Sequence, residues 1–290
     1  MFDFRYHAMS LAAVFIALIV GLLLGVAIGD KELVSSARTD IRDSIRSDVN
    51  DANAERDQAK EELADERQFG EKAFPLLTGG RLRGREVGLV MLGPVDVEPD
   101  AVRKWLEPSG ASLSLVAELR EEVDIKAIGK RARGTRYEDV AAKPELLGSL
   151  ARRVGIQLVR GGRLAGRLRS SLLQTVSGDI GGLDGVIVVR PSQPPADEQV
   201  ADRLSRMQDG LVRGLAQTGV KVVGIEQSAG DESQISWYRD RELSTIDNVD
   251  ETAGQAALVF VLAGADGAFG RRDSAQDLLP PVVATAPRTR

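Results

Sequence analysis

The stretch AMSLAAVFIALIVGLLLGVAIG, residues 8–29, decides how the rest of the chain is organised. It holds 22 consecutive residues without a charged side chain, and only Ser10 is weakly polar. As a helix it would be ~33 Å long, whereas the hydrocarbon core of a bilayer is about 30 Å thick. The sequence therefore predicts a transmembrane anchor over residues 8–29, preceded by a cytoplasmic tail over residues 1–7.

A cleaved signal peptide is the alternative interpretation of this stretch, with Ala27-Ile28-Gly29 as the cleavage site. The apolar part of a signal peptide is usually about 7–15 residues long, so the length of the run favours a retained anchor. Charges flanking the span give a weak orientation signal, since Arg5 precedes it and both signs follow it. The short N-terminal tail favours a single-pass protein of the cytoplasmic membrane with the bulk of the chain extracytoplasmic.

Small residues recur at every fourth position of the predicted anchor. Such a ridge lets two membrane helices approach closely, although glycine is also common in membrane helices that do not dimerise. We interpret the ridge as one half of a parallel homodimer contact formed by Ala13, Ala17, Gly21, Gly25 and Gly29.

Residues 30–72 predict a long polar helix, because glycine is absent until Gly70 and proline until Pro75. Apolar residues along it fit one a/d register, which Arg56 and Glu66 interrupt. A coiled-coil stalk that continues the dimer of the anchor is the favoured interpretation, and a single solvated helix is the alternative. The predicted seam residues are Ile45, Val49, Ala52, Ala59 and Leu63.

The helical pattern is expected to break at Phe74-Pro75 and Gly79-Gly80, where the domain boundary falls. Beyond it, short apolar runs alternate with helical patterns, which is typical of a parallel sheet covered by helices. We predict a Rossmann-like, mostly parallel α/β domain over residues 80–265 and a flexible tail over 266–290. The predicted strands are 86–92, 112–117, 185–189 and 221–225, and the predicted helices include 99–106, material between 141 and 176, 197–217 and 250–262.

The composition limits the classes of function. The net charge is −5, from 38 basic and 43 acidic residues, so nothing in the overall charge favours nucleic acid as a partner. There is no cysteine, which excludes a disulfide scaffold and cysteine nucleophiles.

Motifs of catalysis and cofactor binding are absent from the sequence. The first strand ends in Gly93-Pro94-Val95-Asp96, which is neither a dinucleotide fingerprint nor a P-loop. Gly161-Gly162 with Gly166 follows no convincing strand, so we expect no phosphate-binding glycine loop there. The single histidine, His7, lies at the membrane edge. We expect no enzyme, no cofactor, and no catalytic or cofactor-binding residue.

The carboxylates Asp247, Asp250 and Glu251 are the remaining candidates for chemistry. They sit at or just before the start of the last predicted helix, where acidic residues commonly cap the helix and complement its dipole. We favour this capping role over catalysis.

Metal ligands are equally sparse. A soft-metal site needs Cys, Met or His, and the chain offers His7 and four methionines. Met91 and Met207 lie in a predicted buried strand and on an apolar helix face, so both are expected in the core. The residues alone give copper little support, and we predict no metal ligand.

Two segments resemble the actinobacterial copper-transport protein B family. They are Phe4-Arg5-Tyr6-His7-Ala8-Met9-Ser10-Leu11 with the residues after it, and Ser244-Thr245-Ile246-Asp247-Asn248-Val249-Asp250 with Gly267-Ala268-Phe269-Gly270. The resemblance implies a role in copper export and homeostasis, and the family includes a related cell-separation envelope factor.

Two hypotheses of function follow. The first is a component of copper transport, and the second is a non-catalytic envelope scaffold that engages another protein. We favour the scaffold, since one anchor helix cannot enclose a pore and its ridge offers no polar lining for ions. A carboxylate-dependent enzyme is a more distant alternative.

Overall fold

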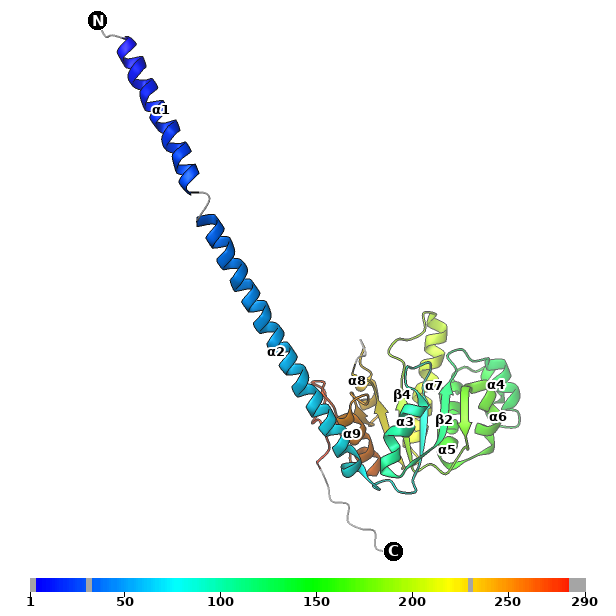
Figure 1. The fold of residues 1–290 in the computed structure, drawn as a ribbon. Coiled ribbons are helices and arrows are strands. Elements are labelled where there is room, and N and C mark those ends of the chain that lie inside the picture. Colours follow the sequence, from blue (N-terminus) through cyan, green and yellow to red (C-terminus); the bar gives the residue numbers. More distant parts are fainter. Residues whose placement is uncertain (1–3, 30–32, 229–231, 282–290) are drawn as a thin grey trace. The chain divides into compact units, whose positions relative to one another are not determined.

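The computed structural model describes residues 4–29, 33–228 and 232–281, which form a mixed α/β structure with a long helical N-terminal part (Figure 1). The chain divides into two compact units, residues 1–66 and 67–290. The first predicted stalk residues, 30–32, lie outside the described residues, as do 1–3 of the predicted tail and 282–290 at the C-terminus.

Helix α1 (Phe4–Gly29) contains the predicted anchor. Its segment Tyr6–Ala27 has a mean hydropathy of 2.7 over its most apolar window, and none of that window is buried against the chain. Among the described residues this is the one helix whose length and composition suit a membrane span.

Helix α2 (Leu33–Thr78) runs past the predicted break at Phe74-Pro75 and includes Pro75 in its interior. The predicted break is therefore wrong at Phe74-Pro75 and confirmed at Gly79-Gly80, since the helix ends at Thr78. Phe74 is buried against Ala256 and Phe260, and the Thr78 hydroxyl donates to the Phe74 carbonyl at 2.7 Å. Burial of this face holds the last turn in helical form although proline lacks one backbone donor. The compact unit that contains the sheet includes the end of this helix, from residue 67.

A seven-stranded sheet forms the centre of the domain, in the order β3-β2-β1-β4-β5-β6-β7. All neighbouring strands are parallel except β3, which pairs antiparallel with β2. The strands are β1 (Glu86–Met91), β2 (Ser112–Leu119), β3 (Leu173–Gly178), β4 (Gly185–Val189), β5 (Lys221–Ile225), β6 (Ser244–Ile246) and β7 (Ala268–Phe269).

Helices cover both faces of this sheet (Figure 1). Alternate strand residues point to opposite faces, so Val90 and Val188 join one core while Leu89 and Ile187 join the other. The first core includes α4 (Ile125–Arg131), α5 (Leu146–Arg160), α6 (Arg163–Leu172), α7 (Glu198–Ala216) and α8 (Ile235–Arg239). The second includes α3 (Pro99–Leu106) and α9 (Thr252–Ala263). Two short 3-10 helices, Glu107–Ser109 and Glu138–Ala141, complete the described elements.

Helices α5 and α7 cross at backbone distance. A Cβ added at Gly214 would lie 2.1 Å from the Arg152 carbonyl oxygen, and one at Gly210 equally close to that of Gly148. Glycine is thus required at both positions of α7 because the facing backbone occupies the space of a side chain. This close contact fixes α5, and with it the α5–α6 corner of the domain.

The structure corrects two further expectations. Residues 173–176 were included in the predicted helical material, but they belong to strand β3, whose side chains are mostly exposed and therefore show no apolar run. The predicted tail over 266–290 is wrong for its described part, since β7 pairs with β6 and buries Ala268 and Phe269. A two-residue strand is too short to produce a sequence pattern.

Candidate functional site

A crevice opens at the carboxyl ends of the central strands. The chain leaves β1 toward β2 and later returns to the other side of β1 as β4, so the strand order reverses between β1 and β4. Ligands of open α/β sheets bind at such a reversal. The crevice has a volume of about 480 Å³ and is lined by residues following β1 (94–97), β4 (190–193) and β5 (226–227), together with Glu232 and Gln234.

Arg190, the first residue after β4, is the centre of a polar network in the wall of this crevice. Its Nε donates to Gln208 Oε1 at 3.0 Å, and its Nη1 donates to Gln234 Oε1. Gln208 in turn donates to the Leu92 carbonyl at 2.7 Å. The guanidinium also lies 4.8 Å from the ring centroid of Trp237. Burial lowers the pKa of Arg190 from its ordinary value. The network ties the ends of β1 and β4 to α7 and α8.

Tyr238 joins the same network from the inside of the fold. Its hydroxyl is fully buried, accepts the backbone N–H of Arg190 at 2.7 Å and donates to the Ile225 carbonyl at 3.3 Å. Burial raises the pKa of Tyr238 well above its ordinary value, so the phenol remains neutral. Tyr238 therefore links the ends of β4 and β5 as a neutral hydrogen-bonding group.

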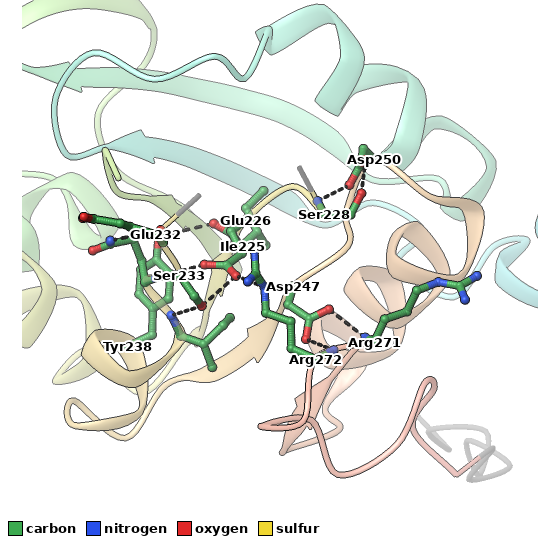
Figure 2. A network of polar contacts seen from close by, with 12 residues as sticks. Ile225, Glu226, Ser228, Glu232, Ser233, Tyr238, Asp247, Asp250, Arg271 and Arg272 are labelled. Carbon is green, nitrogen blue, oxygen red and sulfur yellow. Dashed lines mark hydrogen bonds and ion pairs between the residues drawn. The ribbon is translucent and has the colours of Figure 1, made fainter. Parts of the chain in front are cut away.

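Glu226, the first residue after β5, faces the crevice, and Figure 2 shows it among Ser233, Tyr238 and Arg272. Its Oε1 accepts from Ser233 Oγ at 2.8 Å and forms an ion pair with Arg272 Nε at the same distance, and its Oε2 accepts the Gln234 backbone N–H at 2.7 Å. Burial nevertheless raises the pKa of Glu226. A raised pKa is typical of general bases, but both oxygens of this carboxylate are already engaged.

The segment after β7 contacts the residues that follow β5 and β6 through Arg271 and Arg272 (Figure 2). Asp247, which is 2% exposed, accepts the backbone N–H of Arg271 at 2.8 Å and that of Arg272 at 3.0 Å. The Arg271 side chain pairs with Glu251 at 2.6 Å. The acidic groups at this end of the sheet thus hold the chain that follows β7.

The three carboxylates that the sequence analysis expected to cap the last helix do not do so. Asp247 binds the Arg271–Arg272 backbone, and Asp250 accepts from the Ser228 backbone N–H at 2.8 Å and from its hydroxyl at 2.5 Å. Glu251 occupies the N-cap position of α9 but makes no side-chain cap hydrogen bond. The capping interpretation is wrong because each acid has a tertiary partner that the sequence does not reveal.

Metal donors are dispersed in the described part of the chain. Within residues 4–29, 33–228 and 232–281, no group of three or more His, Cys, Asp or Glu side chains is arranged to hold a metal ion. Met91 and Met207 are buried in the two different cores on opposite faces of the sheet. Their sulfur atoms therefore cannot act together as ligands of a soft metal.

The predicted anchor ridge lies entirely within α1. An added Cβ at Gly21 or Gly25 would meet no atom within 4 Å, and the residues around them are exposed. Residues four apart lie on one face of a helix, so the small residues of the ridge lie on one face of α1. These residues are Ala13, Ala17, Gly21, Gly25 and Gly29.

The predicted stalk seam lies within α2, and its described side chains are exposed. Ile45 is 57% exposed, Val49 52% and Leu63 44%. These are large exposed values for aliphatic residues repeated in one register, and Ala52 and Ala59 occupy the positions between them. The seam residues thus form an exposed apolar stripe along α2.

Comparison with known proteins now places the chain in a family. Residues 1–280 match the family described as "Copper transport outer membrane protein, MctB". The chain belongs to this family. Similar curated proteins are the copper transporters MctB of Mycobacterium bovis (strain ATCC BAA-935 / AF2122/97) and of Mycobacterium tuberculosis strains CDC 1551 / Oshkosh and ATCC 25618 / H37Rv. Each is 30% identical over 125 residues, which are 42% of this chain and 39% of the relative. The matched region thus spans about two fifths of these relatives, and the resemblance stated from the terminal segments is confirmed at the level of the family.

Sequence reasoning missed the crevice residues. Arg190 and Glu226 are 36 positions apart in the sequence, and only the parallel pairing of β4 and β5 brings them to the same edge. Each directly follows a buried apolar run, which was the available signal, because polar residues at the carboxyl ends of parallel strands line the crevice of such sheets.

Proposed function

We propose that this member of the MctB family is a single-pass protein of the cytoplasmic membrane whose extracytoplasmic domain acts as a dimeric, non-catalytic scaffold related to copper transport. The observation that carries the proposal is the exposed apolar seam of α2, which follows in the sequence an apolar helix of membrane-spanning length. A single such helix anchors a domain but encloses no pathway for an ion.

The dimer that we propose is parallel and uses both helices. Gly21 and Gly25 present bare backbone, which permits close van der Waals packing in lipid, where the hydrophobic effect does not drive helices together. Beyond the membrane, Val49 and Leu63 would pair in a coiled coil that Arg56 and Glu66 weaken. Tethering of one contact raises the effective concentration of the other, so neither needs to be strong alone.

A non-catalytic role is supported by the state of the crevice. The carboxylate of Glu226 is engaged at both oxygens. The guanidinium of Arg190 is engaged by two glutamines and a tryptophan ring. Such a network stabilises strand ends rather than leaving a group free for proton transfer. A carboxylate-dependent enzyme would need Glu226 to exchange these partners for a substrate.

The domain is Rossmann-like in our interpretation because helices cover both faces of a sheet whose strand order reverses between β1 and β4. The loop after β1 is Gly93-Pro94-Val95-Asp96, which lacks the glycine spacing that dinucleotide phosphates require. We therefore propose the architecture without the cofactor.

Direct export of copper is the second candidate function, and the family description favours it. The scarcity of soft donors favours an indirect role. The chain has no cysteine, one histidine and four methionines, and two of these, Met91 and Met207, are buried apart from one another. Competition of the purified full chain with a chromogenic Cu(I) chelator separates the two roles. We expect no stoichiometric site, and Cu(I) binding at nanomolar or tighter affinity would replace the scaffold by a direct carrier.

Cross-linking tests the dimer in a chain that has no native thiol. Ala52→Cys lies on the proposed seam and should form a disulfide-linked dimer in membranes under mild oxidation. Ala54→Cys is the matched control, since it is the same residue type two positions further along the helix and outside the seam. Equal cross-linking at both positions, or none at Ala52→Cys, would contradict the parallel dimer.

A second pair of variants tests each half of the contact. Gly21→Leu with Gly25→Leu should weaken the dimer in detergent, and Val49→Asp with Leu63→Asp should weaken it further. A C-terminal reporter that is active only outside the cytoplasm tests the topology, and release of a shortened soluble form would instead indicate cleavage near Ala27-Ile28-Gly29.

A further inference from the structure

A second concave region, which we call the arginine pocket, has a volume of about 620 Å³ and lies outside the crevice. Its wall includes the four exposed side chains of Arg136, Arg153, Arg163 and Arg167, with Tyr137 and Gln157 between them. The contributing elements are α5, α6 and the turn before the 3-10 helix at 138–141. They lie beside α4 at the β2–β3 end of the sheet (Figure 1).

The arginine pocket is a basic region in an acidic chain. Residues 125–178 contain twelve basic and three acidic residues, whereas the whole chain has a net charge of −5. Between residues 146 and 178 there are six arginines and no acid. Among the residues that the structure describes, no carboxylate forms an ion pair with any of the four pocket arginines. Other arginines of the same domain, such as Arg206, Arg213 and Arg241, do have acidic partners.

Two of the pocket arginines are positioned by neutral groups. Arg136 lies 4.9 Å from the ring centroid of Tyr137 and donates to its hydroxyl at 2.7 Å. Arg167 donates to the Arg133 carbonyl at 3.3 Å. Neither of these contacts supplies a negative charge to the guanidinium group.

Helix geometry brings the other lining groups together. Arg153 and Gln157 are four residues apart on α5, and Arg163 and Arg167 are four residues apart on α6, so each pair shares one helix face. Gln157 Oε1 accepts the Ala165 backbone N–H at 2.9 Å, which fixes the first turn of the ten-residue helix α6 at the pocket. The partial positive charge of that helix end adds to the charge of the arginines.

We propose that the arginine pocket binds a small molecule that carries two or more phosphate groups. Guanidinium groups bind phosphate oxygens in pairs through parallel N–H donors. Two phosphate groups carry a charge of about −3 to −4 at neutral pH, which matches four arginines. This site differs from the glycine loop that the sequence analysis excluded at Gly161-Gly162, because side chains rather than backbone amides supply its donors.

The test uses the full chain in detergent and inorganic pyrophosphate as the probe, with isothermal titration calorimetry as the readout. The wild type should bind one equivalent with a Kd below about 1 mM. Arg153→Gln with Arg163→Gln should weaken binding at least ~10-fold, since two charged donors are lost.

The matched control is Arg152→Gln with Arg169→Gln, which removes the same charge from the same two helices. Arg152 donates to Gln217 at 2.8 Å and Arg169 donates to the Val176 carbonyl at 2.8 Å, so both point to partners outside the pocket. The control should change Kd by less than ~2-fold. Near-ultraviolet circular dichroism of all variants confirms that the fold is kept.

Three results would overturn the proposal. The first is the absence of saturable pyrophosphate binding by the wild type. The second is equal weakening by the pocket pair and the control pair, which would indicate diffuse surface charge. The third is binding to phosphatidylglycerol vesicles without binding to pyrophosphate, which would make the region a surface for membrane lipid.

Discussion

The crevice and the arginine pocket are the two charged hollows described on this domain, and they differ in how their charges are paired. In the crevice, Arg190 and Glu226 each have several polar partners within the chain. In the arginine pocket, four guanidinium groups lie together and no described carboxylate pairs with them. Charge alone therefore does not identify a binding site. A charged group that several side chains of the fold hold in place contributes to stability, whereas like charges grouped at an exposed surface remain available to a ligand.

The largest effect on stability is expected from Arg190→Ala. This change leaves Gln208, which is 3% exposed, without the partner of its Oε1, and it removes the stacking on Trp237. The free energy of unfolding should fall by about 2–4 kcal/mol. Both tryptophans, Trp105 and Trp237, lie in the domain, so denaturant unfolding followed by tryptophan fluorescence measures the loss.

Arg153→Ala is the control from the arginine pocket, and it should change the free energy of unfolding by less than about 0.5 kcal/mol. A loss at Arg153 as large as that at Arg190 would remove the contrast between the two hollows.

Asp247→Ala should have the next largest effect, a loss of about 2 kcal/mol, because two backbone N–H groups lose a charged acceptor. The variant should also expose the segment after β7 to limited proteolysis. Asp250→Ala is the matched control, since its carboxylate is exposed and its hydrogen bonds to Ser228 lie at the surface. Similar proteolysis of both variants would show that Asp247 does not fasten this segment.

Tyr238→Phe should cost about 1 kcal/mol. The ring and its packing are kept, while the Arg190 backbone N–H and the Ile225 carbonyl each lose one partner. Thermal unfolding is sufficient to detect the change. An unchanged or higher melting temperature would indicate that Tyr238 contributes through its ring alone.

The smallest effect is expected from Glu226→Gln, and it depends on pH. Burial raises the pKa of Glu226 above the ordinary 4.5, so the folded chain holds this proton more tightly than the unfolded chain. The corresponding stability is present below pH 4.5 and is lost as the pH rises through the raised pKa. The melting temperature of Glu226→Gln relative to wild type should therefore increase between pH 4 and pH 7. A decrease over this range would mean that the pairing with Arg272 outweighs burial.

Particular elements show what the sequence could reveal. The central strands β1, β2, β4 and β5 were predicted because parallel strands are buried on both faces and appear as apolar runs. Strand β3 lies at the edge with most side chains exposed, and β7 has two residues, so neither produces such a run. The propensity of Pro75 favours a helix end there, but the burial of Phe74 against Phe260, which the sequence does not reveal, keeps the last turn of α2 helical.

The two hollows were hidden for different reasons. The crevice forms only because strands far apart in the sequence pair with one another, and no local sequence pattern indicates that pairing. The arginine pocket had a visible signal, since residues 146–178 contain six arginines and no acid. Glycine spacing does not reveal a site of this kind, and a net charge of −5 averages a basic region with an acidic remainder.

We distinguish arginines that stabilise the fold from arginines that are available to a ligand. Thermal unfolding of the full chain with and without pyrophosphate tests this distinction most directly. The pair Arg153→Gln with Arg163→Gln should melt within about 2 °C of wild type when pyrophosphate is absent. Saturating pyrophosphate should raise the melting temperature of the wild type by several degrees and leave that of the pair unchanged. The opposite result would contradict the distinction: a wild type that pyrophosphate does not stabilise, with the pair destabilised as strongly as Arg190→Ala.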